Sequence, residues 1–348
     1  MTAETAKDKA ESPAARLQAV LAEVAAEHYG DGTRIDGLVR LSGGASRGTW
    51  SFDAVTPDGG REPLILKRDP ADQTGEQTYA GVDSRHGVDR WTEGRLVELA
   101  GEAGVPEPRV PFYLAADGRT TAGFVMQRVE GETLGRRILR EEAYAEARPK
   151  LAFQCGQAAA RLHGIPAGRL PPLSIMDVGG ALAHQRGILD NLDHAHAGFE
   201  YGLRWLEERL ELAGDRQTLV HGDFRNGNII VGGDGLRAVL DWESSHIGNP
   251  FSDLGWICIR SWRYGHFKKP VGGFGEIEDM LEGYEAGGGG RVDPRAVHFW
   301  EVFGSLRWGV ICVMMAFTHI IGPQRSVEKA AIGRRAAETE HDLLQLVD

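Results

Sequence analysis

The segment LVHGDFRNGNIIVGGDGLRAVLDWE, Leu219 to Glu243, constrains the fold more than any other part of the chain. Asp223 and Asn228 stand in it as HxDxxxxN, the catalytic-loop pattern of protein kinases, and His221 precedes Asp223 by two residues. In that pattern the Asp accepts the proton of the attacking hydroxyl and the Asn holds a magnesium ion. The segment therefore predicts a site for phosphoryl transfer.

A second carboxylate, Asp241, follows the loop after a predicted hairpin. Residues 229–231 are β-branched, residues 232–235 are turn residues, and residues 236–240 are again mostly apolar. The two strands would bring Asn228 and Asp241 to one edge. Oxygen ligands of this kind suit Mg²⁺, which keeps several waters and is completed by substrate phosphates.

The alternative is an ordinary surface turn, since Gly, Asn and Asp are the commonest turn residues. An isolated Asp and Asn five residues apart would not distinguish the two. Here His221, the apolar residues before it and the strand-borne Asp241 all agree with one template, which favours the catalytic interpretation.

The length and the net charge of the chain limit the classes of protein to which it can belong. A length of 348 residues allows two lobes, each with its own core. The formal net charge of −11 argues against a nucleic-acid binder with a basic face and is compatible with a cationic substrate.

Compartment is predicted from the cysteines and from the apolar runs. Cys155, Cys258 and Cys312 form no CxxC pair, so we expect free, mostly buried thiols in a reducing compartment. Residues 1–14 predict a disordered tail, and no signal peptide is visible. The apolar run 310–321 is too short to cross a bilayer and predicts a buried helix. We expect a cytoplasmic protein with no membrane partner.

A glycine-rich turn between two apolar strands contains Gly43, Gly44 and Ser46. Such a turn lets backbone N–H groups approach nucleotide phosphates. It matches neither the kinase GxGxxGxV loop nor a Walker loop, so taken alone a plain hairpin is the commoner explanation. Residues further along the chain favour a nucleotide-binding role for this turn.

Lys67 ends the next β-like run, where a lysine could contact the α- and β-phosphates. A carboxylate on the following helix, residues 89–100, would orient it, and we choose Glu93 over Glu98 because it lies one turn into the helix. The alternatives are that Lys67 is simply exposed to solvent at the end of its strand and that Glu93 lies on a solvent-exposed face of its helix.

The segment FVMQRVEGETL leads from a buried strand through a glycine into helix. If it connects two lobes, backbone groups near Gln127 and Val129 would hold adenine; an ordinary loop is equally consistent. We therefore place an N-terminal nucleotide-binding lobe at 15–129 and a catalytic and substrate-binding lobe at 130–348.

Four further polar residues are candidates. Asp253 precedes an apolar helix and is either its N-cap or a buried carboxylate that accepts hydrogen bonds from the catalytic loop. Glu301 and Arg307 interrupt an apolar helical pattern and, with Glu243, are the candidate substrate residues.

With Lys67, Glu93, HGDFRNGN and LDWE, the sequence resembles the aminoglycoside phosphotransferase family, and within it the kinase-like domains fused to some acyl-CoA dehydrogenases. The resemblance continues through AGVPEPRV, MQRVEGETL and NPFSDLGW. It implies an α+β, two-lobed protein-kinase-like fold, with an N-terminal antiparallel sheet and helix and a larger, mainly helical C-terminal lobe. ATP and Mg²⁺ are the implied cofactors.

The resemblance also implies roles. Asp223 would be the catalytic base, Asn228 and Asp241 the magnesium ligands, and Lys67 the phosphate lysine, with Asp253 as a supporting carboxylate. The implied reaction moves the γ-phosphate of ATP to a hydroxyl of a small molecule.

Two other hypotheses are open. A nucleotide-binding regulatory module without turnover, a pseudokinase, would have no need to keep Lys67, Asp223, Asn228 and Asp241. A protein kinase is disfavoured because DFG and APE are lacking and residues 241–253 are too few for an activation loop. The acceptor and the oligomeric state cannot be read from the sequence.

Overall fold

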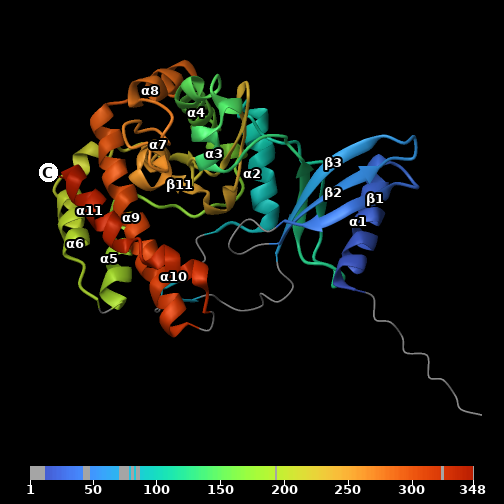
Figure 1. Cartoon of the computed structure of the whole chain (residues 1–348), viewed down its shortest axis with the longest axis horizontal. Helices are drawn as coiled ribbons and strands as arrows, with labels where there is room; N and C mark the ends of the chain where they lie inside the picture. The colour runs from blue at the N-terminus through green and yellow to red at the C-terminus, as the bar shows by residue number, and fades with distance from the viewer. Residues whose placement is uncertain are drawn as a thin grey trace, which may run out of the picture. The chain divides into compact units, whose positions relative to one another are not determined.

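A computed structural model describes residues 12–41, 48–69, 78–79, 82–83, 87–192, 194–322 and 325–347. Contacts group the chain into two units, Met1–Thr74 with Pro108–Arg128, and Gly75–Glu107 with Val129–Asp348 (Figure 1). Residues 75–107 thus group with the second unit, although they were expected in the N-terminal lobe. The expected lobe boundary at 129/130 stays a prediction.

The first unit is an antiparallel sheet with one helix. Its five strands have the order β1-β2-β3-β7-β6. Helix α1 packs against the sheet, and their shared core includes Leu21, Phe52 and Leu66. Its elements are α1 (Pro13–Tyr29), β1 (Arg34–Arg40), β2 (Gly48–Val55), β3 (Arg61–Arg68), β6 (Phe112–Leu114) and β7 (Gly123–Gln127).

Helix α1 begins inside the expected disordered tail. The Ser12 side chain accepts a hydrogen bond from the Ala15 N–H, and Pro13 occupies the first turn. Both features favour a helix start. Residues 1–11 lie outside the described residues.

The second unit is mainly helical, as expected. Its helices are α2 (Arg90–Glu102), α3 (Gly135–Arg140), α4 (Arg148–His163), α5 (Val178–Asn191), α6 (Ala197–Glu207), α7 (Phe251–Cys258), α8 (Ile277–Ala286), α9 (Pro294–Ile321), α10 (Val327–Gly333) and α11 (Ala336–Val347). Five short 3₁₀ helices are η1 (Glu142–Tyr144), η2 (Ala167–Arg169), η3 (Leu210–Leu212), η4 (Trp242–Ser244) and η5 (Arg260–Arg263). Strand pairs are β4 (Thr78–Tyr79) with β5 (Val82–Asp83), β8 (Thr218–Val220) with β11 (His246–Gly248), and β9 (Ile229–Gly232) with β10 (Gly235–Val239).

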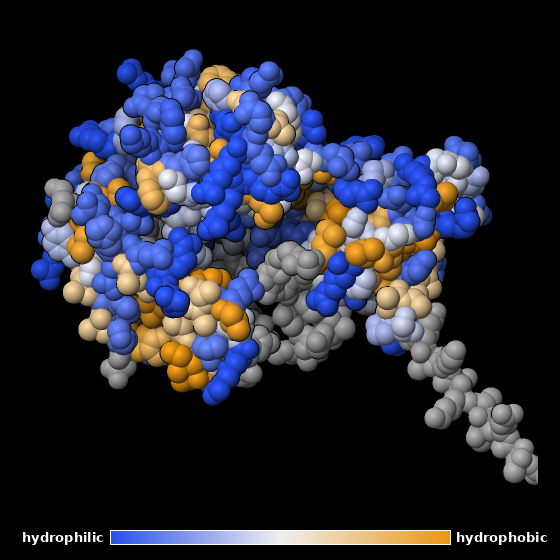
Figure 2. All heavy atoms as spheres, viewed as in Figure 1, coloured by the Kyte–Doolittle hydropathy of each residue, from blue (hydrophilic) through white to orange (hydrophobic). Residues whose placement is uncertain are grey.

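Helix α9 is longer than the apolar run 310–321 predicted. Its 28 residues are long and apolar enough to cross a membrane by length and composition, and 44% of the apolar window is buried inside the structure. Phe299, Leu306 and Val310 belong to a core cluster shared with α5, α6 and α11. Its last residues, Ile320 and Ile321, are exposed, and Figure 2 shows apolar side chains gathered around α10.

The three cysteines, Cys155, Cys258 and Cys312, are free and buried, as predicted. Burial raises the pKa of the Cys155 thiol to about 12. A thiol of this kind stays protonated and acts as a core side chain.

Helices α4 and α8 touch through glycines. A Cβ atom on Gly156 would lie 2.0 Å from the Met280 carbonyl oxygen, and one on Gly283 would lie 2.0 Å from the Phe153 carbonyl oxygen. A side chain at either position would therefore force the two backbones apart.

We expect Gly156→Ala to lower the free energy of unfolding by about 1–3 kcal/mol, the usual cost of overpacking a core. Urea denaturation measures the change. Gly168→Ala is the matched control, because no atom lies within 4 Å of its added Cβ. Equal stability of the two variants would contradict the close helix contact.

Candidate active site

The catalytic loop lies between strands β8 and β9. Strand β9 pairs with β10 in the predicted hairpin, with Ile229 opposite Val239. The Leu240 N–H donates to the Asn228 carbonyl oxygen at 2.8 Å. The hairpin thus brings Leu240, the residue before Asp241, next to Asn228. The sequence of the hairpin predicted this return of the chain.

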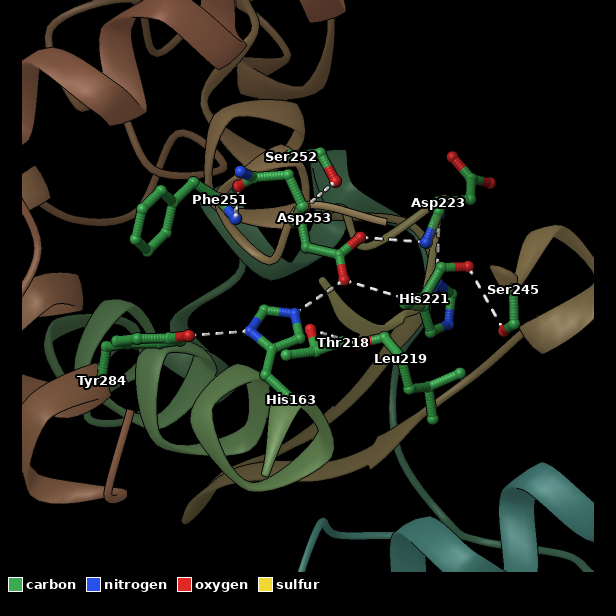
Figure 3. A network of polar contacts seen from close by, with 12 residues as sticks. His163, Thr218, Leu219, His221, Asp223, Ser245, Phe251, Ser252, Asp253 and Tyr284 are labelled. Carbon is green, nitrogen blue, oxygen red and sulfur yellow. Dashed lines mark hydrogen bonds and ion pairs between the residues drawn. The ribbon is translucent and has the colours of Figure 1, made fainter. Parts of the chain in front are cut away.

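A buried carboxylate anchors the start of the loop (Figure 3). Asp253 Oδ2 accepts the His221 backbone N–H at 2.8 Å, and its Oδ1 accepts the Gly222 N–H at 2.9 Å. His163 Nε2 lies 3.0 Å from Asp253 Oδ2, and His163 Nδ1 lies 3.0 Å from the Tyr284 hydroxyl. Asp253 lies in the first turn of α7, not at the N-cap, so its contacts match the second of the two alternatives.

Asp253 remains ionised in this buried place. Burial alone would raise the pKa of its carboxyl group, but the hydrogen bond and charge of His163 and the interactions with His221 bring it below the ordinary value. Such compensation is what allows a charge to be buried.

His221 supports the loop in its neutral form. Burial lowers the pKa of its imidazole. Its Nδ1 accepts the Asp223 backbone N–H at 3.1 Å, so the Nε2–H is assigned as the donor to the Leu240 carbonyl oxygen at 3.0 Å. Both ring nitrogens are therefore used to orient backbone groups around Asp223.

Three donors surround the Asp223 carboxylate. Trp256 Nε1 donates to Oδ1 at 2.7 Å, and Asn228 Nδ2 donates to Oδ2 at 2.6 Å. Arg225 Nε lies 3.0 Å from Oδ1 and 3.2 Å from Oδ2. Trp256 and Arg225 were not predicted. The signals available were the position of Arg225 inside the loop and the spacing of Trp256, three residues after Asp253 on one helix face.

The predicted magnesium ligands carry suitable oxygen atoms. Because Asn228 Nδ2 donates to Asp223, Asn228 Oδ1 is the atom that could bind a cation. Asp241 has left-handed backbone angles, φ 70° and ψ 60°, which are uncommon outside glycine and cluster at functional sites. Among the described residues no group of three or more His, Cys, Asp or Glu side chains could hold a metal. An Asn and an Asp fit Mg²⁺, which needs few protein ligands.

The candidate nucleotide residues are divided between the units. Lys67 lies on β3, opposite Thr49 of β2 and Phe124 of β7, in the first unit. Gln127 ends β7 in the same unit, and Val129 begins a segment of the second. Gly43, Gly44 and Ser46 lie outside the described residues. Their roles stay predictions.

Glu93 lies on α2 in the second unit and is 1% exposed. It forms a buried ion pair with Arg90 within the same helix. The Glu243 carboxylate lies 3.8 Å from the other side of the Arg90 guanidinium. The orienting role predicted for Glu93 and the substrate role predicted for Glu243 remain untested by these contacts.

The candidate substrate residues Glu301 and Arg307 both make contacts within the second unit, and their substrate role stays a prediction. Glu301 is 5% exposed and pairs with Arg263 at 2.5 Å; burial raises the pKa of its carboxyl group to about 7 despite that partner. Arg307 Nη1 donates to the Gly222 carbonyl oxygen at 2.9 Å, and its guanidinium lies 4.6 Å from the Trp256 ring centroid. Polar residues in an apolar helix can be buried when they are paired, which the pattern alone does not reveal.

The family described as "Phosphotransferase enzyme family" matches residues 37–300. The chain belongs to this family. Acyl-CoA dehydrogenase family member 11 of Pongo abelii is 28% identical over 265 residues, which is 70% of this chain and 32% of that protein. The chain therefore spans about a third of that relative, and the resemblance to such kinase-like domains is confirmed.

Solved structures share the fold of this chain. A Ralstonia eutropha protein assigned as an aminoglycoside phosphotransferase is 19% identical, with a TM-score of 0.72 and coverage of 94% of this chain and 97% of that one. Spectinomycin phosphotransferase APH(9)-Ia, solved with ADP and spectinomycin, is 14% identical, with a TM-score of 0.58 and coverage of 94% of each chain. The predicted protein-kinase-like fold is confirmed. Family membership supports a phosphotransferase, the broad enzyme class that the sequence predicted.

Proposed function

We propose that the protein transfers the γ-phosphoryl group of ATP to a hydroxyl of a small molecule, with Asp223 accepting the hydroxyl proton. The observation that carries this proposal is the way Asp223 is held. Its carboxylate is oriented by Trp256 and Asn228 while its loop is anchored on Asp253. A carboxylate that is fixed, yet 22% exposed at its side chain, can receive a proton from a bound hydroxyl.

The cofactors we propose are ATP and Mg²⁺. Support for the nucleotide comes from the fold, since the spectinomycin phosphotransferase structure contains ADP. Asn228 and Asp241 would hold Mg²⁺, which when bound neutralises charge on the transferred phosphate. The proposed nucleotide-binding residues are Gly43, Gly44, Ser46, Lys67, Glu93, Gln127 and Val129.

Phosphoryl transfer to a small-molecule acceptor is favoured over nucleotide binding without turnover. Asp223 and Asn228 are hydrogen-bonded to one another, which supports a single site that holds the base and a metal ligand together. We propose action in a reducing compartment such as the cytoplasm, because Cys155, Cys258 and Cys312 are free.

The test is ATP consumption with Mg²⁺ against a panel of aminoglycosides, hydroxyacyl-CoA esters, sugars and choline-like alcohols. The Asp223→Ala variant serves as the blank. Turnover with one class, lost in the variant, would establish the kinase and its acceptor chemistry. ATP binding without turnover on any acceptor would favour the regulatory module.

Asp241→Asn should raise the Mg²⁺ concentration needed for half-maximal rate by at least about tenfold, since even residues behind metal ligands contribute that much. Asn removes the charge yet tolerates the left-handed backbone of Asp241. A Mg²⁺ titration of initial rates measures the shift. Asp234→Asn, in the exposed turn of the same hairpin, is the control, and equal curves would exclude Asp241 as a ligand.

A further inference from the structure

Helix α7 supports the predicted base at two levels. Asp253 binds the backbone of the catalytic loop, while Trp256 binds the side chain of Asp223. Residues three apart lie on the same face of a helix, about one turn from each other. One rigid turn therefore fixes both the path of the loop and the direction of the Asp223 carboxylate.

The indole ring of Trp256 has little freedom. The residue is 4% exposed, with the Arg307 guanidinium 4.6 Å and the Trp262 ring 5.5 Å from its own ring centroid. On the neighbouring helix, a Cβ added at Gly304 would lie 3.2 Å from the Trp256 ring. Packing thus determines where the Nε1–H points, independently of any substrate.

The uncharged indole N–H of Trp256 is a suitable donor for the Asp223 carboxylate, which must stay ionised to accept a proton. An ionised carboxylate offers about four lone-pair positions. Trp256 donates to Oδ1 and Asn228 donates to Oδ2, and the one Nε–H of Arg225, 3.0 Å from Oδ1 and 3.2 Å from Oδ2, is the third donor. One of the four positions therefore remains. An indole N–H uses one lone pair and stabilises the ionised form without adding charge or releasing a proton.

We propose that Trp256 is a positioning residue, whose indole N–H holds the Asp223 carboxylate so that a remaining lone pair faces the acceptor hydroxyl. This inference rests on the proposed phosphotransfer by Asp223. It adds a determinant outside the catalytic loop, 33 residues along the chain from the base.

Trp256→Phe removes the N–H and keeps an aromatic ring. We expect kcat to fall about tenfold or more, the worth of a hydrogen bond to a charged group, with the KM for ATP unchanged. The KM for the acceptor should also stay close to that of the wild type, because the indole N–H holds the base and neither substrate. A merely structural role would raise KM or lower the free energy of unfolding along with kcat.

Trp308→Phe is the matched control. Trp308 belongs to the same aromatic cluster, with its ring 4.8 Å from that of Trp262, and its buried Nε1 has no hydrogen-bond partner within the described structure. It should retain the kcat and the KM values of the wild type. A Trp256→Phe enzyme with the wild-type kcat, or with a KM raised by as much as kcat is lowered, would overturn the proposal.

A second measurement does not depend on turnover. The chain has eight tryptophans, and the Trp256 indole N–H resonance is the one missing from the ¹⁵N spectrum of Trp256→Phe. If that variant does not fold, Arg307→Lys can be used instead. It replaces the guanidinium that lies over the Trp256 ring, so the Trp256 resonance should change its position. We expect the resonance to shift in Asp223→Asn, because its hydrogen-bond acceptor changes from a carboxylate to an amide oxygen. An unshifted resonance would overturn the role of Trp256 even in an active kinase, whereas an inactive wild type with a shifted resonance would refute the proposed function alone.

Discussion

Asp223→Ala is expected to lower kcat by about 10²- to 10⁴-fold, the usual contribution of a positioned acid or base. The substitution removes the only carboxylate that Trp256, Asn228 and Arg225 together surround among the described residues. At about 1.4 kcal/mol per tenfold, the loss is about 3–5 kcal/mol of transition-state stabilisation. Affinity for ATP should change little, because the proton acceptor acts on the other substrate. Initial rates and nucleotide titration measure the two quantities separately.

Two further variants make this result specific. Asp223→Asn keeps the size of the side chain and an oxygen that can accept the Trp256 N–H, but it cannot take up the hydroxyl proton; it should be as slow as Asp223→Ala. Asp190→Ala removes an exposed carboxylate from α5 and should leave the rate unchanged. Full activity in Asp223→Asn would show that Asp223 is not the base.

The catalytic segment could be predicted because its determinants are local. β-branched residues, a glycine turn and a second apolar run are sufficient to specify the β9–β10 hairpin, which the structure contains. The antiparallel first sheet was implied by the family resemblance and not by local signals alone, since β3 pairs with β7 across a long stretch of chain that contains α2. The glycine-rich loop cannot be compared, because residues 42–47 lie outside the described residues.

The partners of the loop could not be predicted, because they come from distant helices. Nothing near Asp223 in the sequence indicates that Trp256 reaches its carboxylate or that Arg307 reaches the Gly222 carbonyl oxygen. For Asp253 the sequence allowed either a helix N-cap or a buried carboxylate that accepts hydrogen bonds from the catalytic loop. Which of the two is present depends on the residue at which α7 begins. His163, at the end of the distant helix α4, supplies the hydrogen bond that helps to keep Asp253 ionised.

Asp253→Ala is expected to lower the free energy of unfolding of the second unit by about 3–5 kcal/mol at neutral pH, the usual cost of breaking a buried ionic contact. The substitution leaves the backbone N–H groups of His221 and Gly222 and the ring of His163 without their buried acceptor. Urea denaturation followed by tryptophan fluorescence measures it. Of the eight tryptophans, only Trp50 lies in the first unit, so the signal reports mainly on the second.

A matched control separates a buried anchor from a helix cap. Asp177 caps α5 by accepting the Gly180 N–H at 2.6 Å and is exposed, so Asp177→Ala should cost only about 1 kcal/mol. If Asp253→Ala costs no more than Asp177→Ala, Asp253 acts only at the start of its helix, and the catalytic loop is not anchored through it.

The effect of Asp253→Ala should also depend on pH in a defined direction. The folded protein lowers the pKa of Asp253 below its ordinary value, which is about 3.9 in an unfolded chain. A depressed pKa stabilises the folded state above the unfolded value, and this contribution is lost as the pH falls through the folded one. The stability difference between wild type and variant should therefore be present at neutral pH and shrink as the pH falls below about 4. A difference that instead grew on acidification would mean that Asp253 is protonated in the folded state, and the ionic anchoring of the catalytic loop would have to be abandoned.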